Sequence, residues 1–198
     1  MLHPNSFIMA WMLIEPLRVS AFCAYLAAWL VLAIAAVAGA VPRRMRQAAA
    51  SARMTAPVAV GILLQGAAAF AIRLSMDNAP LRPRTFELGG TLALAPLAAL
   101  LFVWALRSGP KRGDAERLVT GGAYAWVRHP IYLAFLAMLV ATGLVISGGF
   151  KLVAAVGLYL AGSESRIASE EAEMAEKFPA DYAQYRLRTR WRYLPGLR

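Results

Sequence analysis

The sequence predicts an all-α integral membrane fold with about five transmembrane helices and a C-terminal cytosolic amphipathic helix. Of the 198 residues, 60% are hydrophobic and only 16% are charged, which is too apolar for an ordinary soluble domain. Long uncharged stretches recur along the chain, and basic residues gather between and after them. We therefore expect a single transmembrane domain over residues 1–198, with the bilayer as its solvent.

Four uncharged stretches are long enough to cross a membrane. They cover residues 19–41, 54–72, 88–106 and 131–150 and contain 23, 19, 19 and 20 residues. At about 1.5 Å per helical residue, each spans a hydrocarbon core of about 30 Å. The apolar residues 7–14 are too few to span, so we expect them at the interface or against the bundle.

A fifth, shorter span follows the fourth. Gly148 and Gly149 can turn the chain, and residues 152–163 are uncharged. These 12 residues cover only about 18 Å as a helix, so Glu164 and Arg166 begin within or near the bilayer. Ionisable residues there indicate a functional site, although Arg166 can also simply extend its charge to the interface.

The basic residues predict the orientation. Sixteen Lys and Arg follow the first, third and fifth spans, against five on the opposite side. The positive-inside rule then places the N-terminus outside and the C-terminus in the cytosol. An Ala- and Arg-rich chain is compatible with a bacterial source, so we expect the bacterial inner membrane.

The formal charge of +10 does not indicate a nucleic-acid-binding protein. The basic residues are clustered between apolar runs rather than along one soluble face, which favours anionic membrane lipids as partners and no nucleic acid. The single cysteine, Cys23, lies in an apolar run and is expected to pack there, which leaves neither a disulfide framework nor a Cys-based metal site.

Residues 118–132 combine a Gly-Gly turn, aromatic side chains and two potential cations before a helix start. Pro130 suits the first helical turn, because its missing N–H costs nothing there. The free amides of that helix, reinforced by Arg128 and His129, form a predicted anion site, with Tyr132 in the same neighbourhood. Each residue also has an ordinary interpretation, as a topology signal, an interface aromatic or a surface histidine.

The helix expected after the fifth span is amphipathic. Arg166 and Glu170 are i,i+4 neighbours, whereas the adjacent Glu170 and Glu171 point roughly 100° apart and cannot form one metal clamp by themselves. We predict no metal site. The basic and aromatic segment 182–195 is typical of an anionic-lipid anchor and is equally compatible with a contribution to the site.

These motifs resemble the isoprenylcysteine carboxyl methyltransferase family over residues 118–195, which we interpret as the catalytic and cofactor-binding region. The resemblance is carried by Gly122, Tyr124, Arg128-His129-Pro130-x-Tyr132, Arg166, Glu170-Glu171, Phe178, Tyr182, Tyr185 and Arg190. Two positions depart from the pattern of many relatives. Ala134 stands where those proteins have Gly, and Pro179 follows Phe178 where they have Gly.

The resemblance implies a transmembrane methyltransferase that uses S-adenosylmethionine without a Rossmann domain. It implies cofactor-binding roles for Tyr124, His129, Pro130, Tyr132, Glu170 and Glu171. It also makes Arg128, Arg166 and Arg190 the candidates for holding a substrate anion. The expected acceptor is lipophilic and carries a carboxylate, an amine or a thiol.

Two other functions stay open. Membrane sterol reductases that use NADPH carry a related Arg-His-Pro-Asn-Tyr segment, although Ile131 occupies the Asn place here. A non-enzymatic membrane protein that binds anionic lipid or a partner would also fit the basic clusters. The sequence leaves open the identity of the acceptor and the oligomeric state.

Overall fold

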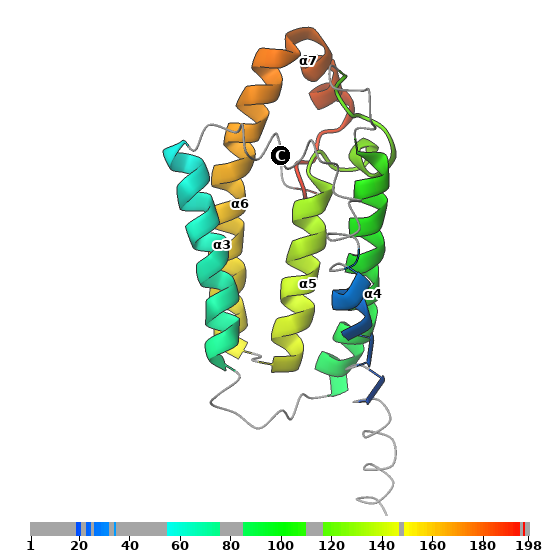
Figure 1. Cartoon of the computed structure of the whole chain (residues 1–198), viewed down its shortest axis with the longest axis vertical. Helices are drawn as coiled ribbons and strands as arrows, with labels where there is room; N and C mark the ends of the chain where they lie inside the picture. Colours follow the sequence, from blue (N-terminus) through cyan, green and yellow to red (C-terminus); the bar gives the residue numbers. More distant parts are fainter. Residues whose placement is uncertain are drawn as a thin grey trace, which may run out of the picture.

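The computed structural model describes residues 55–75, 85–109, 117–146, 149–194 and 196, together with residues 19–20, 23–24, 26–31 and 34. This part of the chain is helical and contains no strand, which confirms the all-α prediction for it. Figure 1 shows the arrangement. The labelled elements are α3 (Ala56–Ser75), α4 (Thr85–Ser108), η1 (Gly122–Ala125), α5 (Pro130–Ile146), α6 (Gly149–Lys177) and α7 (Pro179–Arg188).

Three of the predicted spans coincide with helices. The stretches 54–72, 88–106 and 131–150 correspond to α3, α4 and α5. By length and composition, α4 can cross a membrane over Phe86–Ser108, and the apolar parts of α3 and α5 are shorter. Residues 7–14, much of 19–41 and the turn residues 147–148 lie outside the described residues. The total of five spans therefore stays a prediction.

Helix α6 unites two segments that the sequence treats separately. It begins at Gly149, whose φ of 57° suits the turn after α5, and it runs for 29 residues to Lys177. The short fifth span and the Glu-rich amphipathic segment are thus one continuous helix, which rises beyond the ends of α3 and α5 (Figure 1). Pro179 is the first residue of α7, so the helix direction changes at Phe178.

The long helices form two close pairs, α3 with α6 and α4 with α5, and the pairs contact each other far less (Figure 1). In the first pair the closest approach is at Gly61 and Gly162. A Cβ atom on either glycine would lie 2.7 Å from the carbonyl oxygen of the other. Only residues without a side chain permit this crossing, which is the small-residue packing expected of membrane helices.

The bundle has two apolar cores, one within the α4–α5 pair and one that joins α5 to the α3–α6 pair. The core between α4 and α5 is built from small and aromatic side chains, among them Ala98, Phe102 and Ala134. The second core joins α3, α5 and α6 and includes Ile72, Tyr159 and Ile167.

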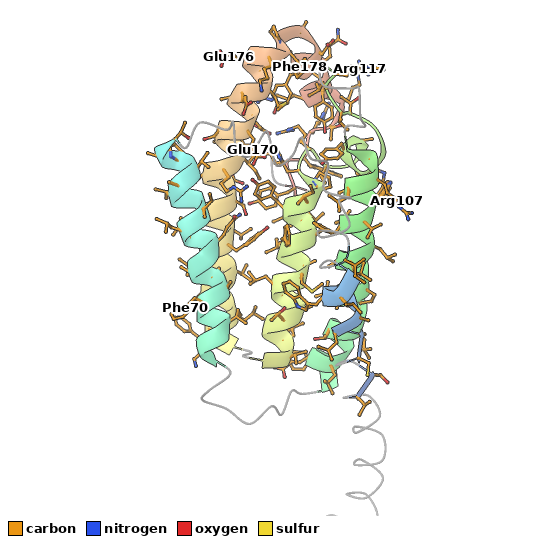
Figure 2. All side chains as sticks on the ribbon, in the orientation of Figure 1. Phe70, Arg107, Arg117, Glu170, Glu176 and Phe178 are labelled. Carbon is orange, nitrogen blue, oxygen red and sulfur yellow. The ribbon has the colours of Figure 1, made fainter. Side chains whose placement is uncertain are left out.

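The outer faces of the bundle are also apolar. Leu63, Leu100 and Val153, from three different helices, are 72%, 68% and 68% exposed. Figure 2 shows Phe70 pointing outward in the same way. A bundle with apolar side chains inside and outside is what a lipid environment requires.

After α7 the chain turns back against the start of α5. We call residues 189–194 the C-terminal strap. The amides of Arg128 and His129 donate to the carbonyl oxygens of Trp191 (2.9 Å) and Arg192 (2.7 Å). Tyr193 is only 2% exposed and belongs to the second core. The strap therefore anchors the segment that carries the motif residues.

Candidate active site

The start of α5 positions the motif residues. Pro130 is its first residue and is buried, and the carbonyl of His129 accepts a hydrogen bond from the Leu133 amide at 3.4 Å. The amides of Arg128 and His129 are already bonded to the strap. These two amides are thus used to hold the fold together, and an anion at this helix start would have to use other donors.

Arg128 lies behind the helix start, where its Nε and Nη1 both bond protein groups. Its Nε donates to Glu171 Oε1 at 2.9 Å, and its Nη1 donates to the carbonyl oxygens of Thr189 (2.7 Å) and Arg190 (2.9 Å). The side chains of Arg128 and Glu171 are 5% and 8% exposed. Burying this ion pair is tolerable because further hydrogen bonds surround it.

Arg192 completes this buried group. Its Nη2 lies 3.2 Å from Glu171 Oε2, and its Nη1 donates to Glu164 Oε2 at 2.7 Å. We call Arg128, Glu171 and Arg192 the inner cluster. Sequence reasoning counted Arg192 only among the basic residues of the tail, and no motif distinguished it from its neighbours.

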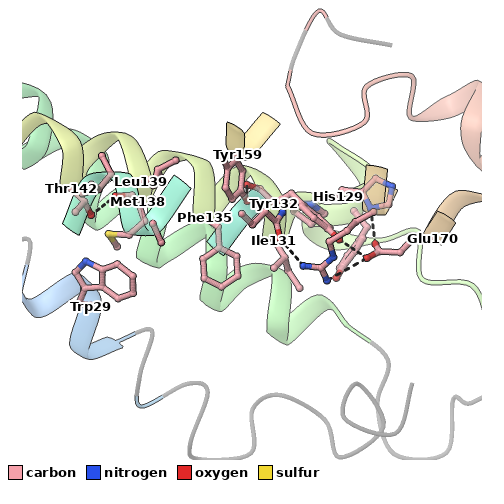
Figure 3. A pocket seen from close by; sticks show the side chains of 16 residues that line it. Trp29, His129, Ile131, Tyr132, Phe135, Met138, Leu139, Thr142, Tyr159 and Glu170 are labelled. Atoms are coloured by element: carbon pink, nitrogen blue, oxygen red, sulfur yellow. Dashed lines mark hydrogen bonds and ion pairs between the residues drawn. The ribbon is translucent and has the colours of Figure 1, made fainter. Parts of the chain in front are cut away.

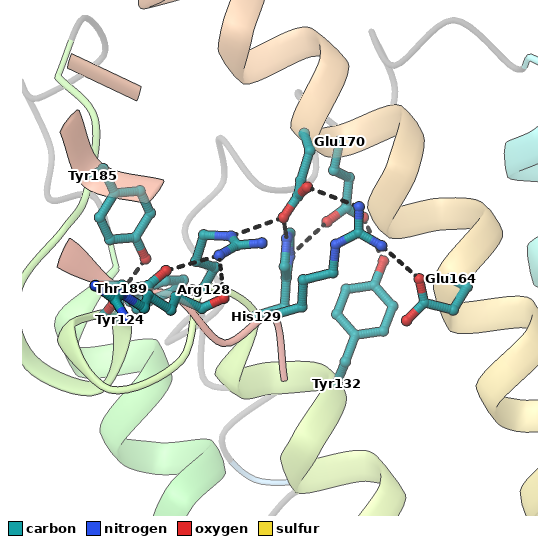
Figure 4. Close-up of polar contacts among 11 residues, drawn as sticks. Tyr124, Arg128, His129, Tyr132, Glu164, Glu170, Tyr185 and Thr189 are labelled. Carbon is teal, nitrogen blue, oxygen red and sulfur yellow. Dashed lines mark hydrogen bonds and ion pairs between the residues drawn. The ribbon is translucent and has the colours of Figure 1, made fainter. Parts of the chain in front are cut away.

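A second group of charged side chains, which we call the cavity cluster, consists of Glu170, Tyr132 and Arg166. The Tyr132 hydroxyl donates to Glu170 Oε1, and the guanidinium of Arg166 lies 5.3 Å from the centre of the Tyr132 ring. Arg166 Nη2 is 3.8 Å from Glu170 Oε1. Glu170 is 40% and Arg166 34% exposed, against 8% for Glu171 and 5% for Arg128 in the inner cluster. Figure 4 shows Tyr132 beside Glu170, with Arg128 on the other side of His129.

His129 lies between the two clusters (Figure 4). Its Nδ1 is 3.5 Å from Glu170 Oε2, and its Nε2 is 3.4 Å from Glu171 Oε1. Burial alone would lower the pKa of His129, but the two carboxylates outweigh it and raise that pKa above 6.5. The imidazole is therefore charged over a wider pH range than in water.

The buried carboxylate responds in the opposite direction. Burial would raise the pKa of Glu171, but hydrogen bonds from His129 and Arg128 and the charges of Arg128 and Arg192 lower it from 4.5 to about 2. Glu171 thus stays ionised to a lower pH than an ordinary glutamate.

A cavity of about 640 Å³ opens beside the cavity cluster, a volume typical of small-molecule sites. At one end it is polar, with Gln65, Tyr124, His129, Tyr132, Arg166 and Glu170. The rest follows α5 and is almost entirely apolar, with Ile131, Phe135, Met138 and Leu139 (Figure 3). The remaining lining residues are Trp29, Ala69, Ile72, Pro130, Thr142 and Tyr159.

The wall around Tyr124 is held by the C-terminal residues. The Tyr185 hydroxyl donates to the Tyr124 carbonyl at 2.7 Å, and Thr189 Oγ1 donates to the Ala125 carbonyl at 3.3 Å. Burial, followed by the charge of Glu170, raises the pKa of Tyr124 to about 12. Its hydroxyl therefore stays protonated and can serve as a donor in the cavity.

The structure divides the residues expected to form the site into three groups. Those lining the cavity are Tyr124, His129, Pro130, Tyr132, Arg166 and Glu170. Arg128 and Glu171 lie behind them in the inner cluster. Arg190 is exposed, and within the described part of the chain only its carbonyl oxygen takes part in the site, as an acceptor for Arg128.

Comparisons with known proteins bear on the same region. Residues 92–176 match the isoprenylcysteine carboxyl methyltransferase (ICMT) family. A protein-S-isoprenylcysteine O-methyltransferase of Saccharomyces cerevisiae is 35% identical over 76 residues, which are 38% of this chain and 32% of that protein. The alignment therefore spans about a third of the yeast protein. No solved structure matches the chain. Helix α3 and the C-terminal strap lie outside the matched residues.

Proposed function

We propose that this protein is an S-adenosylmethionine-dependent membrane methyltransferase acting on a lipid-like acceptor. The premise is the ICMT-like family that these matches support. One observation carries the proposal. The cavity has charged groups of both signs at one end and an apolar lining over the rest of its length. Such a cavity suits a zwitterionic cofactor beside a hydrophobic chain.

The polar end offers the groups that S-adenosylmethionine requires. Glu170 suits the ammonium and sulfonium charges, and Arg166 and His129 suit the carboxylate. The Tyr124 hydroxyl can bond the ribose hydroxyls. When bound, this cofactor supplies a methyl group at a cationic sulfur. In this proposal Glu171 and Arg128 do not touch the cofactor, because neither lines the cavity and they bond each other and the strap.

The apolar part suits the chain of an acceptor. From Ile131 to Thr142 the lining follows α5 for about 16 Å at about 1.5 Å per residue, enough for an extended acyl or isoprenoid chain. The sparse contact between the two helix pairs offers a lateral route from the bilayer. We further propose that the bundle has five spans and that the polar end faces the cytosol, because most basic residues lie on that side.

The charge state of the site favours an acceptor that needs no base. Methyl transfer is an in-line displacement, so alignment and exclusion of water should dominate the rate gain. Because its pKa is raised, His129 is protonated more of the time than a free imidazole, which suits it to holding negative charge rather than to accepting a proton. A carboxylate acceptor fits these conditions. An amine or a thiol would have to arrive deprotonated.

Ligand-dependent melting of the purified protein in detergent tests this proposal. Saturating S-adenosylmethionine should raise the melting temperature, and NADPH should not. Labelled methyl groups should then pass from the cofactor into a membrane lipid extract. Stabilisation by NADPH alone would indicate reductase chemistry. No shift with either cofactor at saturation would support a non-enzymatic, lipid-binding protein.

A further inference from the structure

Gln65 of α3 is a polar residue in an otherwise apolar stretch, and the proposed function does not yet explain it. We infer that Gln65 is a positioning residue that holds Arg166 away from Glu170, so that both charges remain available in the cavity. The inference rests on the proposed function, because it concerns the same ligand site. It adds helix α3, which lies outside the residues matched to the family.

Both ends of the Gln65 amide are used. Oε1 accepts a hydrogen bond from Arg166 Nη1 at 2.8 Å, and Nε2 donates to Ser163 Oγ at 3.1 Å. These two partners fix the orientation of the amide, because the Arg166 guanidinium can only donate and the Ser163 hydroxyl can accept. A polar side chain within the predicted second span is costly unless it is satisfied in this way.

Without this amide, Arg166 would have one obvious partner. Glu170 is its i,i+4 neighbour on α6, yet Nη2 stays 3.8 Å from Oε1, which is long for a direct ion pair. The short bond from Gln65 holds the guanidinium over the Tyr132 ring instead. In a partly desolvated cavity, a released Arg166 would close onto Glu170, and each charge would lose its capacity for a ligand.

The helix crossing supports this geometry. Gly61 of α3 touches Gly162 of α6. Gln65 lies one helical turn after Gly61 in α3, and Arg166 lies one turn after Gly162 in α6. This contact sets the distance between α3 and α6 at the level where the two side chains meet. The reach of Gln65 is therefore fixed by the backbone, as a positioning role requires.

The affinity for S-adenosylhomocysteine, measured by calorimetry on the detergent-solubilised full chain, tests the inference. Gln65→Leu should weaken binding about tenfold, the size expected when a charge-assisted contact is lost. Gln65→Glu keeps an acceptor for Arg166 but adds a carboxylate that would pair with its charge, so this variant should not restore the affinity. In an Arg166→Gln background, Gln65→Leu should change binding little, because no guanidinium remains to be released. Equal losses in both backgrounds would mean a merely structural role and overturn the inference.

A matched control and a ligand-free measurement complete the test. Ser165→Ala removes another α3–α6 hydrogen bond, to the Pro57 carbonyl at 2.7 Å, at an exposed position away from the cavity, and should leave binding unchanged. The melting temperatures of Gln65→Leu, Arg166→Gln and the double variant should be non-additive. Additive changes would overturn the inference. Failure of the wild type to bind the ligand, with non-additive melting, would instead count against the proposed function alone.

Discussion

The inner cluster and the cavity cluster each contain a glutamate of α6 beside arginine, but only the residues of the cavity cluster line the cavity. Glu171 has both carboxylate oxygens bonded to arginines and is 8% exposed, whereas Glu170 is 40% exposed and faces the cavity. A turn of roughly 100° between neighbours separates the two environments. The contrast shows that one of two adjacent carboxylates can stabilise the fold while the other stays available to a ligand, depending on the arginines around each.

Replacing Arg128 of the inner cluster should have the largest effect. Arg128→Met leaves Glu171 with fewer partners and frees two strap carbonyls, so we expect a loss of about 3–5 kcal/mol in unfolding free energy. The measurement is thermal unfolding in detergent. Arg190→Met is the control, because that exposed residue should change stability by no more than about 0.5 kcal/mol. Equal melting of the two variants would refute the distinction.

Acid should weaken the inner cluster selectively. The folded-state pKa of Glu171 is lowered from 4.5 to about 2, so its stabilisation is complete above pH 4.5 and lost as the pH falls toward 2. The shift corresponds to about 3 kcal/mol. The raised pKa of His129 acts oppositely, with stabilisation present below pH 6.5 and lost as the pH rises above it. Melting temperatures from pH 6 to 3 should fall less steeply for Glu171→Gln than for the wild type; parallel curves would contradict this assignment.

The adjacent glutamates offer the sharpest test of the comparison. Glu170→Gln should weaken S-adenosylmethionine binding about tenfold with little change in ligand-free melting, because this carboxylate is open to the cavity. Glu171→Gln should mainly lower the melting temperature of the ligand-free protein. Calorimetry and thermal unfolding on both variants provide the check. If both variants lost mainly stability, the cavity cluster would be structural as well.

The smallest effect concerns two tyrosines of α7. The Tyr182 hydroxyl is buried without a well-formed hydrogen bond, although burial and the charge of Glu171 raise its pKa to about 12. Tyr182→Phe should therefore be neutral or slightly stabilising. Tyr185→Phe loses the bond to the Tyr124 carbonyl and should cost about 1 kcal/mol. Thermal unfolding distinguishes them, and a larger loss for Tyr182→Phe would show that its hydroxyl does bind Glu171.

Local pattern predicted much of the fold and part of the site. Uncharged stretches located α3, α4 and α5 because burial in lipid requires continuous apolar residues. Pro130 indicated the start of α5, because a helix accommodates proline well only in its first turn. The spacing of Glu170 and Glu171 showed that they could not face the same way.

The other parts of the site depend on contacts between residues far apart in the sequence, which local patterns do not predict. Arg128 looked like a substrate-binding cation, and its acceptors are carbonyl oxygens of the strap, which no side-chain pattern reveals. Gln65 became part of the site only because two glycines bring α3 against α6. Arg192 had no feature that distinguished it from Arg190, and only the fold shows that Arg192 pairs with Glu171 while the Arg190 side chain is exposed.

The strap also has a consequence for biosynthesis. Ribosomes deliver Arg128 and His129 well before the carbonyl groups of Trp191 and Arg192 that their amides bond. Until these residues have emerged, the amides of Arg128 and His129 lack their partners and Glu171 lacks the charge of Arg192. The start of α5 therefore reaches its final structure only after synthesis has passed the strap.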